Sequence, residues 1–488
     1  MKNLTLFFFL FVSLQSVAQV SEDLPVDFLS QEFHKGRRSS LREKLPPNSV
    51  ALFFANPIRN RANDVDFVYH QDPNFYYLTG YKEPDAVLLI FKDKQTANNG
   101  TLYDEIIFVQ PRSAFDEMWT GRRLGDEGVK KQLGLSQAFN NSEFKKYNVD
   151  FSKFDAILFN DFENDVRDNP ADSSDLYDLI SQFKQKVNYP SKDNTLNVAR
   201  EANKNNLNTV ELARLIGTLR GIKTKEELDL IRKAVSISCM GQREVMKAIK
   251  PGMSEREIQG IHEFVFKKYQ AEDVGYPSIV GAGHNGCILH YIENYKPNIG
   301  KSDLILMDLG AEFHGYTADV TRTIPISGQF SPEQKQIYEL VLKAQEEAMK
   351  VCKPGVTTDE LSKLTHSVIN KGLKELGIIK NENEKHLYYP HGCCHHIGLD
   401  VHDPIPKGIL QENMIITIEP GIYIPDNANC DKRWWGIAIR IEDDFLITKE
   451  GVENLSNAAP RSIAEIESLM KEPSALDDFI LPEINPKN

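Results

Sequence analysis

Two short segments in the second half of the chain repeat one another. KPGMSEREI spans residues 250–258, and KPGVTTDEL spans residues 353–361. Each has Lys-Pro-Gly, an apolar residue, and then Ser254 or Thr357 with a glutamate three positions later, which is typical of a turn that leads into a capped helix. Each is also followed by a β-rich segment with two carboxylates. Chance can produce one such match, but the repetition of both features predicts a domain of two related halves that face one another.

The carboxylates of these β-rich segments stand in apolar surroundings. Asp308 lies in LILMDLG and Glu419 in MIITIEPGIYI, while Asp319 and Glu442 lie in the strands that follow each of them. A buried carboxylate is costly unless it is paired or bound to a metal. For any one of these acids an N-cap, a turn or an ordinary salt bridge is the favoured explanation. Because the arrangement occurs in both halves, we expect the four acids to converge on bound metal ions, two in number.

The stretch HGCCHHIGLDVH, residues 391–402, has four histidines and two adjacent cysteines. It looks at first like a zinc site, since structural zinc is held by thiolates and imidazoles. Oxygen-rich ligands with one imidazole instead suit harder ions such as Mn²⁺. Adjacent cysteines also chelate one tetrahedral ion poorly, so we expect Cys393 and Cys394 to be free buried thiols or disulfide partners. Six cysteines in all lie in the second half, and their pairing cannot be deduced from the sequence.

The first half has the pattern of an α/β domain. Apolar strands are predicted at residues 50–54, 86–91, 105–109 and 156–160, with helical stretches between them. The pattern changes near Gly221, where Thr224 and Glu227 form a capping box that opens an amphipathic helix. We therefore expect an N-terminal domain over residues 19–222, a second domain over 223–462 and a loosely attached tail over 463–488.

The N-terminal residues predict a secretory signal over residues 1–18. A lysine precedes an apolar run from Leu4 to Leu14, and small residues follow at Ser16 and Ala18. The run is shorter than a membrane span, and no later segment spans either, so we expect an exported protein, periplasmic or extracellular, without stable membrane insertion. The net charge of −13 repels phosphate backbones, so no nucleic-acid partner is expected.

Several of these motifs together resemble the aminopeptidase P and prolidase group of metallopeptidases. They are ILHY at residues 288–291, MDLG at 307–310, TADVTRT at 317–323, HGCCHHIGLDVH, IEPGIY at 418–423 and IRIEDD at 439–444. The resemblance covers about residues 225–460 and extends to the first half through FYYLTGYKEPDAVLLI and WTGRRLG. It implies an α+β C-terminal domain with the pita-bread fold, whose halves are related by a pseudo-twofold axis, after an α/β N-terminal domain.

The resemblance also implies a dinuclear metal site and a set of catalytic positions. Two divalent ions, most simply Mn²⁺, would be held by Asp308, Asp319, His395, Glu419 and Glu442. Glu419 would also move a proton, His402 would stabilise the oxyanion, and His290 and His391 would orient the substrate. Arg440, which shares a strand face with Glu442, would support the carboxylates. His396, which is next to His395, falls outside the pattern and is interpreted as an ordinary core or surface histidine.

The activity implied by the resemblance is that of an Xaa-Pro aminopeptidase, which releases the first residue of peptides with proline in second position. One alternative is a prolidase, which accepts Xaa-Pro dipeptides and shares the ligands. A more distant alternative is a metal-free amidinohydrolase or a binding protein of the same fold. Relatives also assemble as dimers or tetramers, so a homo-oligomer is expected.

Overall fold

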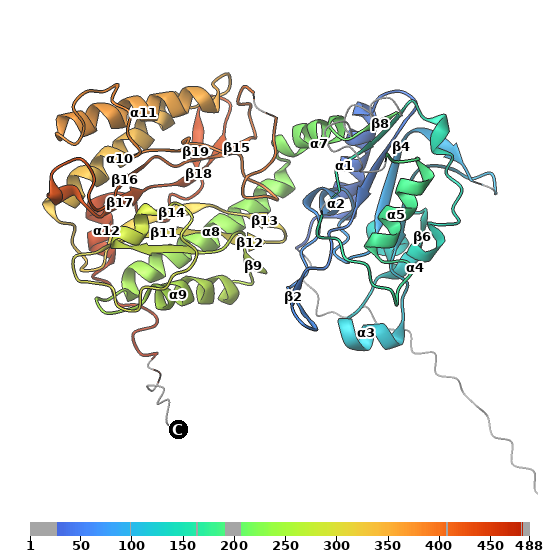
Figure 1. Ribbon diagram of the computed structural model, residues 1–488, viewed down its shortest axis with the longest axis horizontal. Helices are drawn as coiled ribbons and strands as arrows, with labels where there is room; N and C mark the ends of the chain where they lie inside the picture. Colours follow the sequence, from blue (N-terminus) through green and yellow to red (C-terminus); the bar gives the residue numbers. More distant parts are fainter. Residues whose placement is uncertain are drawn as a thin grey trace, which may run out of the picture.

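The computed structural model describes residues 27–97, 99–162, 164–190, 206–406, 408–479 and 481. These residues form two domains that lie side by side (Figure 1). The predicted signal over residues 1–18 falls outside the described residues. Among the helices of the described ranges, none is long and apolar enough to cross a membrane.

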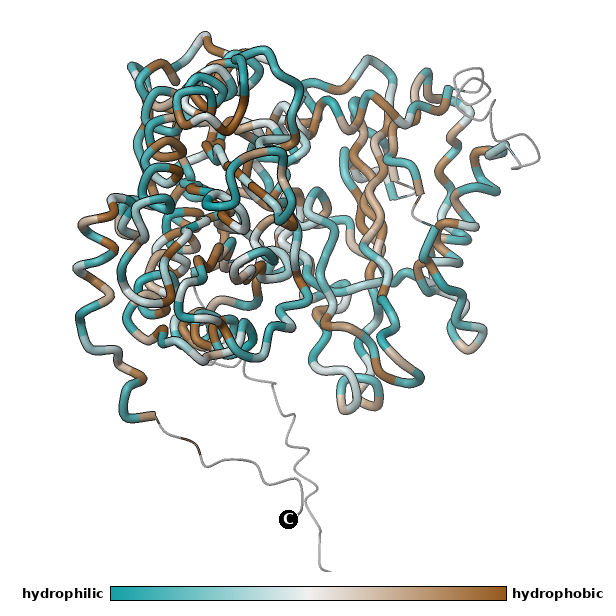
Figure 2. The backbone as a smooth tube through the Cα atoms, turned by 60° about the vertical axis from the view of Figure 1, so that its left-hand side comes forward, coloured by the Kyte–Doolittle hydropathy of each residue, from teal (hydrophilic) through white to brown (hydrophobic). Residues whose placement is uncertain are grey.

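The N-terminal domain is built on a six-stranded mixed sheet. The strand order is β6-β5-β4-β1-β7-β8, with β1 antiparallel to β4 and parallel to β7. The predicted strands are confirmed as β1, β4, β5 and β7, whose hydrophobic residues run through the interior of the domain (Figure 2). The strands are β1 (Ser49–Phe54), β4 (Val87–Thr96), β5 (Leu102–Val109), β6 (Ala138–Asn140), β7 (Ala156–Phe159) and β8 (Leu207–Asn208), with a separate hairpin of β2 (Asn60–Ala62) and β3 (Val65–Asp66).

Helices cover this sheet and lead into the second domain. Their bounds are α1 (Gln31–Lys44), α2 (Pro73–Thr79), α3 (Ala114–Thr120), α4 (Gly125–Gly128), α5 (Leu176–Lys186) and α7 (Glu211–Gly221). The next helix, α8 (Lys225–Ala248), begins at the predicted capping box, in which Thr224 accepts from the Glu227 amide and the Glu227 carboxylate accepts from the Thr224 amide. The turn between α7 and α8 thus lies where the sequence places the domain boundary.

The C-terminal domain has helix pairs on either side of a set of small sheets (Figure 1). The outer pairs are α8 with α9 (Glu255–Lys268), and α10 (Pro332–Val351) with α11 (Thr358–Glu375). The sheets between them have the orders β10-β11-β14, β13-β12-β9, β15-β18-β19 and β16-β17. Their strands are β9 (Asp273–Val274), β10 (Ile279–Ala282), β11 (Leu304–Leu309), β12 (Ala311–Phe313), β13 (Tyr316–Thr317), β14 (Val320–Pro325), β15 (Ile415–Ile418), β16 (Gly421–Ile424), β17 (Ile437–Arg440), β18 (Asp443–Ile447) and β19 (Val452–Asn454).

The sequence repeat corresponds to a structural repeat. Helices α9 and α11 both follow a Lys-Pro-Gly turn, and both begin with a complete capping box, Ser254 with Glu257 and Thr357 with Glu360. Each helix packs on the longer helix that precedes it, so the domain consists of two halves with the same order of elements. The predicted pseudo-twofold arrangement of helices and strands is therefore confirmed.

The C-terminal segment differs from the expected tail. Residues 463–469 form helix α12 (Ile463–Leu469), which has its own capping box, and Ile466 and Leu469 are buried in the core. Further on, the Ser474 hydroxyl donates to Glu244 of α8 at 2.6 Å. The prolines and acids of the segment led the sequence analysis to miss this short amphipathic helix. The folded domain therefore extends beyond residue 462.

Candidate metal centre and active site

The four carboxylates are brought together by strand ends from both halves. Asp308 lies in β11 and Asp319 immediately precedes β14, while Glu419 follows β15 and Glu442 stands between β17 and β18. The halves join at Thr321, whose hydroxyl donates to Glu442 at 2.6 Å and whose carbonyl accepts from the Glu442 amide at 3.1 Å. These hydrogen bonds between the two halves fix the distance between the pair Asp308 and Asp319 and the pair Glu419 and Glu442.

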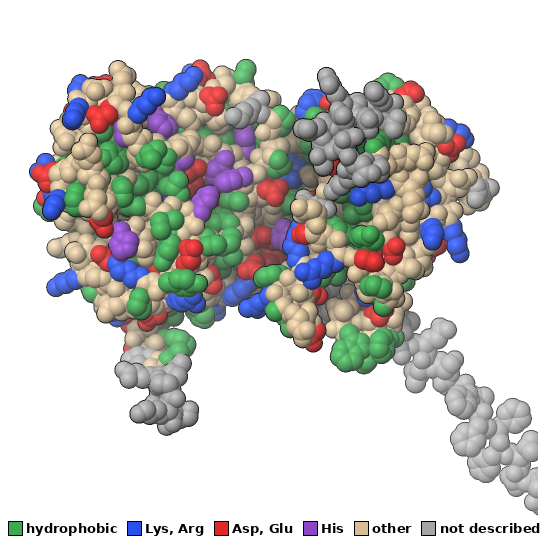
Figure 3. All heavy atoms as spheres, in the orientation of Figure 1, with side chains coloured by type: hydrophobic (Ala, Val, Ile, Leu, Met, Phe, Trp, Pro, Cys, Tyr) green, Lys and Arg blue, Asp and Glu red, His purple; other side chains and the backbone are tan. Residues whose placement is uncertain are grey.

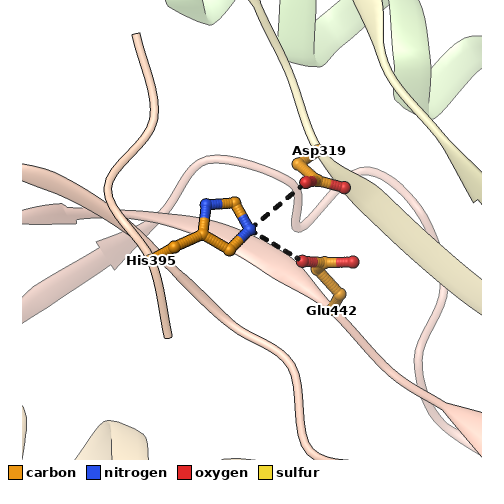
Figure 4. Close-up of side chains that lie close together, drawn as sticks. All are labelled: Asp319, His395 and Glu442. Carbon is orange, nitrogen blue, oxygen red and sulfur yellow. Dashed lines mark ion pairs between the residues drawn. The ribbon is translucent and has the colours of Figure 1, made fainter. Parts of the chain in front are cut away.

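His395 is the histidine that faces these acids. Its Nε2 lies 3.4 Å from Asp319 and 3.8 Å from Glu442 (Figure 4). The same nitrogen lies 3.5 Å from Glu419. Its Nδ1 lies 3.1 Å from the carbonyl of His396, a contact in which Nδ1 carries the proton and Nε2 presents its lone pair. His396 forms a backbone β-bridge with Ile416 of β15. Among the described residues, the ligand atoms that lie close together belong to Asp319, His395 and Glu442, and His396 is not one of this group.

Burial dominates the electrostatics of the cluster, and repulsion between neighbouring carboxylates adds to it. Burial raises the pKa of Asp319 well above its usual value, and the charges of Asp308 and Asp444 raise it further. Burial and the neighbouring acids raise the pKa of Glu442 in the same way. Burial also raises the pKa of Glu419 to about 7, against the opposing effects of His395 and Arg440. Burial and nearby negative charges disfavour the ionised form of a carboxylate, so these acids hold protons strongly unless a cation lies among their oxygens.

Asp308 is the exception, because it has a cationic partner. Burial alone would raise its pKa, but Arg440 and the hydroxyl of Tyr276 outweigh burial and hold the pKa below its usual value. The Arg440 guanidinium donates to Asp308 at 2.5 Å and to the hydroxyl of Tyr423 at 3.0 Å. The structure therefore places Arg440 among the carboxylates, where the sequence predicted that it supports them.

Two tyrosines of the site were not predicted from the sequence. The Tyr276 hydroxyl lies 2.6 Å from both Asp308 and Asp319, so it links two acids of the same half. The Tyr423 hydroxyl contacts Arg440 and lies 2.9 Å from Nε2 of His391. Tyr276 sits in the loop before β10 and carries no sequence signal, whereas Tyr423 belongs to the quoted IEPGIY motif and could have been identified from it.

A cavity of about 340 Å³ opens over the cluster. The remaining predicted site residues, His290, His391 and His402, all lie on its wall. The ring of His402 stands 4.3 Å from that of His395, centre to centre, and Nδ1 of His391 lies 3.7 Å from Glu419. Burial lowers the pKa of His391 to about 4, so this imidazole is neutral near pH 7. All eight residues predicted to contact metal or substrate therefore line one cavity.

This donor set fits divalent cations. Four carboxylates and the imidazole of His395 line the same cavity, and the ligand atoms of Asp319, His395 and Glu442 lie within 4.8 Å of one another. Among the described residues, no cysteine sulfur belongs to that group. Oxygen-rich sets of this kind suit hard or borderline divalent ions. Burial is the main cause of the raised pKa values of Asp319, Glu419 and Glu442, and neighbouring carboxylates add to it, so bound cations would offset both effects.

Comparison with known proteins agrees with this fold and site. The pattern of metallopeptidase family M24 matches residues 229–449, and that of the aminopeptidase P N-terminal domain matches residues 34–155. The chain is 34% identical to an Xaa-Pro aminopeptidase of Escherichia coli over 454 residues, which cover 90% of this chain and 97% of that one. It is 35% identical to an Xaa-Pro aminopeptidase of Haemophilus influenzae, over 91% of this chain and 98% of that one.

Solved structures extend the likeness to the whole architecture. Aminopeptidase P of E. coli with the inhibitor Pro-Leu superimposes with a TM-score of 0.78 at 31% identity, over 91% of this chain and 98% of that one. An aminopeptidase of Pseudomonas aeruginosa superimposes with a TM-score of 0.79 at 33% identity, over the same shares of the two chains. The protein is thus a two-domain metallopeptidase with a pita-bread catalytic domain. It belongs to metallopeptidase family M24, with the N-terminal domain of the aminopeptidase P group.

Proposed function

We propose that this chain is an Xaa-Pro aminopeptidase, which hydrolyses the bond between the first residue of a peptide and a proline in second position. The observation that carries the proposal is that Asp308, Asp319, His395, Glu419 and Glu442 line one open cavity. Within it, the ligand atoms of Asp319, His395 and Glu442 lie within 4.8 Å of one another. The names and coverage of the full-length relatives support the proline specificity. Proline lacks a backbone N–H and has a fixed φ, so a site shaped around its ring can select it.

Asp308, Asp319, His395, Glu419 and Glu442 would hold two divalent ions, most simply Mn²⁺. Two such ions activate water as a nucleophile and polarise the scissile carbonyl. Glu419, whose carboxylate lies 3.5 Å from His395 at the wall of the cavity, would hold and release a proton during the reaction. His402 would donate to the carbonyl oxygen as negative charge develops there, and His290 and His391 would orient the peptide.

His391 is positioned for this role by its neighbours. Its Nδ1 lies 2.8 Å from the carbonyl of Gly392 and its Nε2 lies 2.9 Å from the Tyr423 hydroxyl. Because the Arg440 guanidinium donates to the same hydroxyl, Tyr423 is free to donate its proton to Nε2. The imidazole orientation is therefore linked through Tyr423 and Arg440 to Asp308.

The test is hydrolysis by the mature protein, loaded with Mn²⁺, of an Xaa-Pro dipeptide, an Xaa-Pro-Yaa tripeptide and an Xaa-Ala-Yaa control. Cleavage of the tripeptide with the control spared supports the proposal. Cleavage of the dipeptide alone would identify a prolidase instead. Absence of cleavage with any divalent ion would favour the metal-free amidinohydrolase or binding protein. The same assay with Mg²⁺, Zn²⁺ and Co²⁺ tests the choice of manganese.

We further propose that the protein is exported and acts as a homo-oligomer, a dimer or tetramer. The export proposal rests on the sequence of residues 1–18, and N-terminal sequencing of the secreted or periplasmic protein tests it. The oligomer is supported by helix α3, where Phe115, Met118 and Trp119 are each more than two-thirds exposed. Hydrophobic side chains gather on the surface of the N-terminal domain at the place where Figure 1 labels α3 (Figure 3). Such apolar surfaces mark protein contacts. Light scattering of the wild type and of Trp119→Glu measures the assembly; a monomeric wild type would contradict it.

A further inference from the structure

The adjacent thiols of Cys393 and Cys394 touch one another at the wall of the active-site cavity. Their sulfur atoms lie 3.0 Å apart, and all six cysteines of the chain are free in the structure. Cys394 lines the cavity and is partly exposed, whereas Cys393 is fully buried behind it. The thiols therefore stand in contact, with one of them open to a small molecule in the cavity.

We propose that Cys393 and Cys394 form a reversible oxidation site, at which a peroxide closes a disulfide between neighbouring residues. The Cys394 sulfur attacks one peroxide oxygen, the O–O bond breaks, and a sulfenic acid and water result. The Cys393 sulfur then attacks the Cys394 sulfur and expels the second oxygen as water. Overall, two thiols are oxidised to one disulfide, and hydrogen peroxide is reduced to two waters.

The adjacency of the two residues makes this bond labile rather than structural. Cα atoms of neighbouring residues are about 3.8 Å apart across a trans peptide. Disulfides usually join Cα atoms about 4.4–6.8 Å apart, and departures from that range store strain and make the bond easier to reduce. Strained, accessible disulfides are the ones that serve as reversible switches. A thiol reductant is therefore expected to reopen the pair.

The backbone that carries the pair also carries the metal centre. The Cys393 carbonyl accepts from the Glu419 amide at 2.8 Å, and His395 follows Cys394 directly. On the other side, the Ser362 hydroxyl of α11 accepts from the Cys393 amide at 3.1 Å. Closing the disulfide twists the peptide between the two cysteines, and that peptide is held between these anchors. The twist is thus transmitted to two residues of the proposed metal set, His395 and Glu419.

The consequence for activity rests on the proposed function, but the chemistry does not. The Mn²⁺-loaded, full-length mature protein is treated with hydrogen peroxide, blocked with an alkylating reagent and digested with trypsin. The peptide of residues 386–407 contains both cysteines and no other. We expect it to become lighter by two hydrogen atoms, to resist alkylation, and to regain both alkylation sites after dithiothreitol. Recovery of the peptide with both thiols alkylated, or with added oxygen alone, would overturn the proposal even if the protein hydrolyses no peptide.

Hydrolysis of the Xaa-Pro-Yaa tripeptide is then measured for the same samples. Because a displacement of about 1 Å in a site can cost 10²-fold in rate, we expect at least a tenfold loss that dithiothreitol restores. Cys393→Ser should lack the restorable loss, and its peptide should gain oxygen instead of losing hydrogen. Cys239→Ser, which removes a buried thiol of α8 in contact with the Ser456 carbonyl, is the matched control and should respond as the wild type does. A disulfide that closes without changing activity would overturn its link to His395 and Glu419.

Discussion

Gln242 and Gln345 occupy equivalent positions in the two halves of the catalytic domain. Each is fully buried on the longer helix of its half, and each donates its side-chain amide to two backbone carbonyls next to proposed metal-site acids. The Gln242 amide reaches Met307 at 3.2 Å and Val320 at 2.7 Å, beside Asp308 and Asp319. The Gln345 amide reaches Ile418 at 3.0 Å and Ile441 at 3.4 Å, beside Glu419 and Glu442. Each helix pair thus holds the spacing of the two acids in its own half.

Replacing either glutamine by leucine should loosen the acids of its half. Gln345→Leu leaves buried carbonyls without a donor, which costs about 1–3 kcal/mol of unfolding free energy. We expect urea unfolding to show this loss and titration calorimetry to show weaker Mn²⁺ binding. Gln336→Leu, an exposed position on the same helix, is the control and should change neither measurement appreciably. Unaltered metal affinity in Gln345→Leu would argue against a positioning role.

Two of the predicted residues that the structure brings to one cavity contradict their local pattern, because Asp308 and Glu419 are acids at apolar strand positions. Asp319, His395 and Glu442 are identified through the motifs TADVTRT, HGCCHHIGLDVH and IRIEDD. Gln242 and Gln345 contradict nothing locally, because a polar residue in an amphipathic helix is ordinary. Their function depends on which strand the helix crosses. That is long-range packing, which no short pattern encodes.

The same reasoning explains the other differences. Tyr276 reaches the acids because β10 pairs with β11, an alignment that sets Ile279 opposite Asp308. Nothing in the loop before β10 predicts that pairing. Helix α12 was missed because three prolines and several acids nearby outweighed a short apolar pattern at Ile466 and Leu469. The N-terminal strands, in contrast, were recognised because their apolar runs are long and bounded by turns.

The junction between the domains depends on a buried ion cluster next to His402. Asp403 is fully buried and accepts from Arg220 of α7 and, at 2.7 Å, from Lys223. Burial alone would raise the pKa of Asp403, but Lys223 and Arg220 outweigh burial and lower it. Asp403→Ala would leave the buried Lys223 without its carboxylate partner and Arg220 with Asp400 alone. Breaking a buried ion pair in this way typically costs about 3–5 kcal/mol. We expect a large fall in the urea midpoint and a loss of kcat through displacement of His402.

An exposed ion pair provides the comparison for that variant. Lys225 and Asp229 form a pair at 2.6 Å on the surface of α8, and both side chains are mostly exposed. Asp229→Ala should leave unfolding nearly unchanged, because solvent and salt screen such pairs. If Asp403→Ala and Asp229→Ala lower the free energy of unfolding equally, burial does not determine how much these ion pairs contribute to stability.

Metal removal should destabilise the protein as well as inactivate it. A ligand that binds only the folded state adds about 2.7 kcal/mol of stability at 100 times its dissociation constant. A chelator should therefore lower the thermal midpoint of the Mn²⁺-loaded wild type. Glu442→Ala should bind no metal, hydrolyse no peptide and be insensitive to the chelator. Glu453→Ala, on the exposed strand β19, should behave as wild type. Full activity of Glu442→Ala with metal retained would refute the ligand assignment.

Stability should also fall in mild acid because His34 is buried in its neutral form. Burial lowers the pKa of His34 to about 4, and Arg38 lowers it further, while a hydrogen bond at 3.0 Å to the Tyr77 carbonyl opposes both. In the unfolded chain the pKa returns to about 6.5. The unfolded state therefore binds the proton first as pH falls, and the stabilising contribution, complete above pH 6.5, is lost between about pH 6.5 and 4.

The size of this effect follows from the shift, which corresponds to about 3 kcal/mol. His34→Gln keeps an N–H donor for the Tyr77 carbonyl but cannot titrate in this range. The difference in unfolding free energy between wild type and His34→Gln should be constant above pH 7 and should change in favour of the variant as pH falls to 4. Urea unfolding at half-unit pH steps measures it. If the unfolding free energies of the two proteins change in parallel with pH across this range, His34 takes up its proton in the folded domain at the same pH as in the unfolded chain.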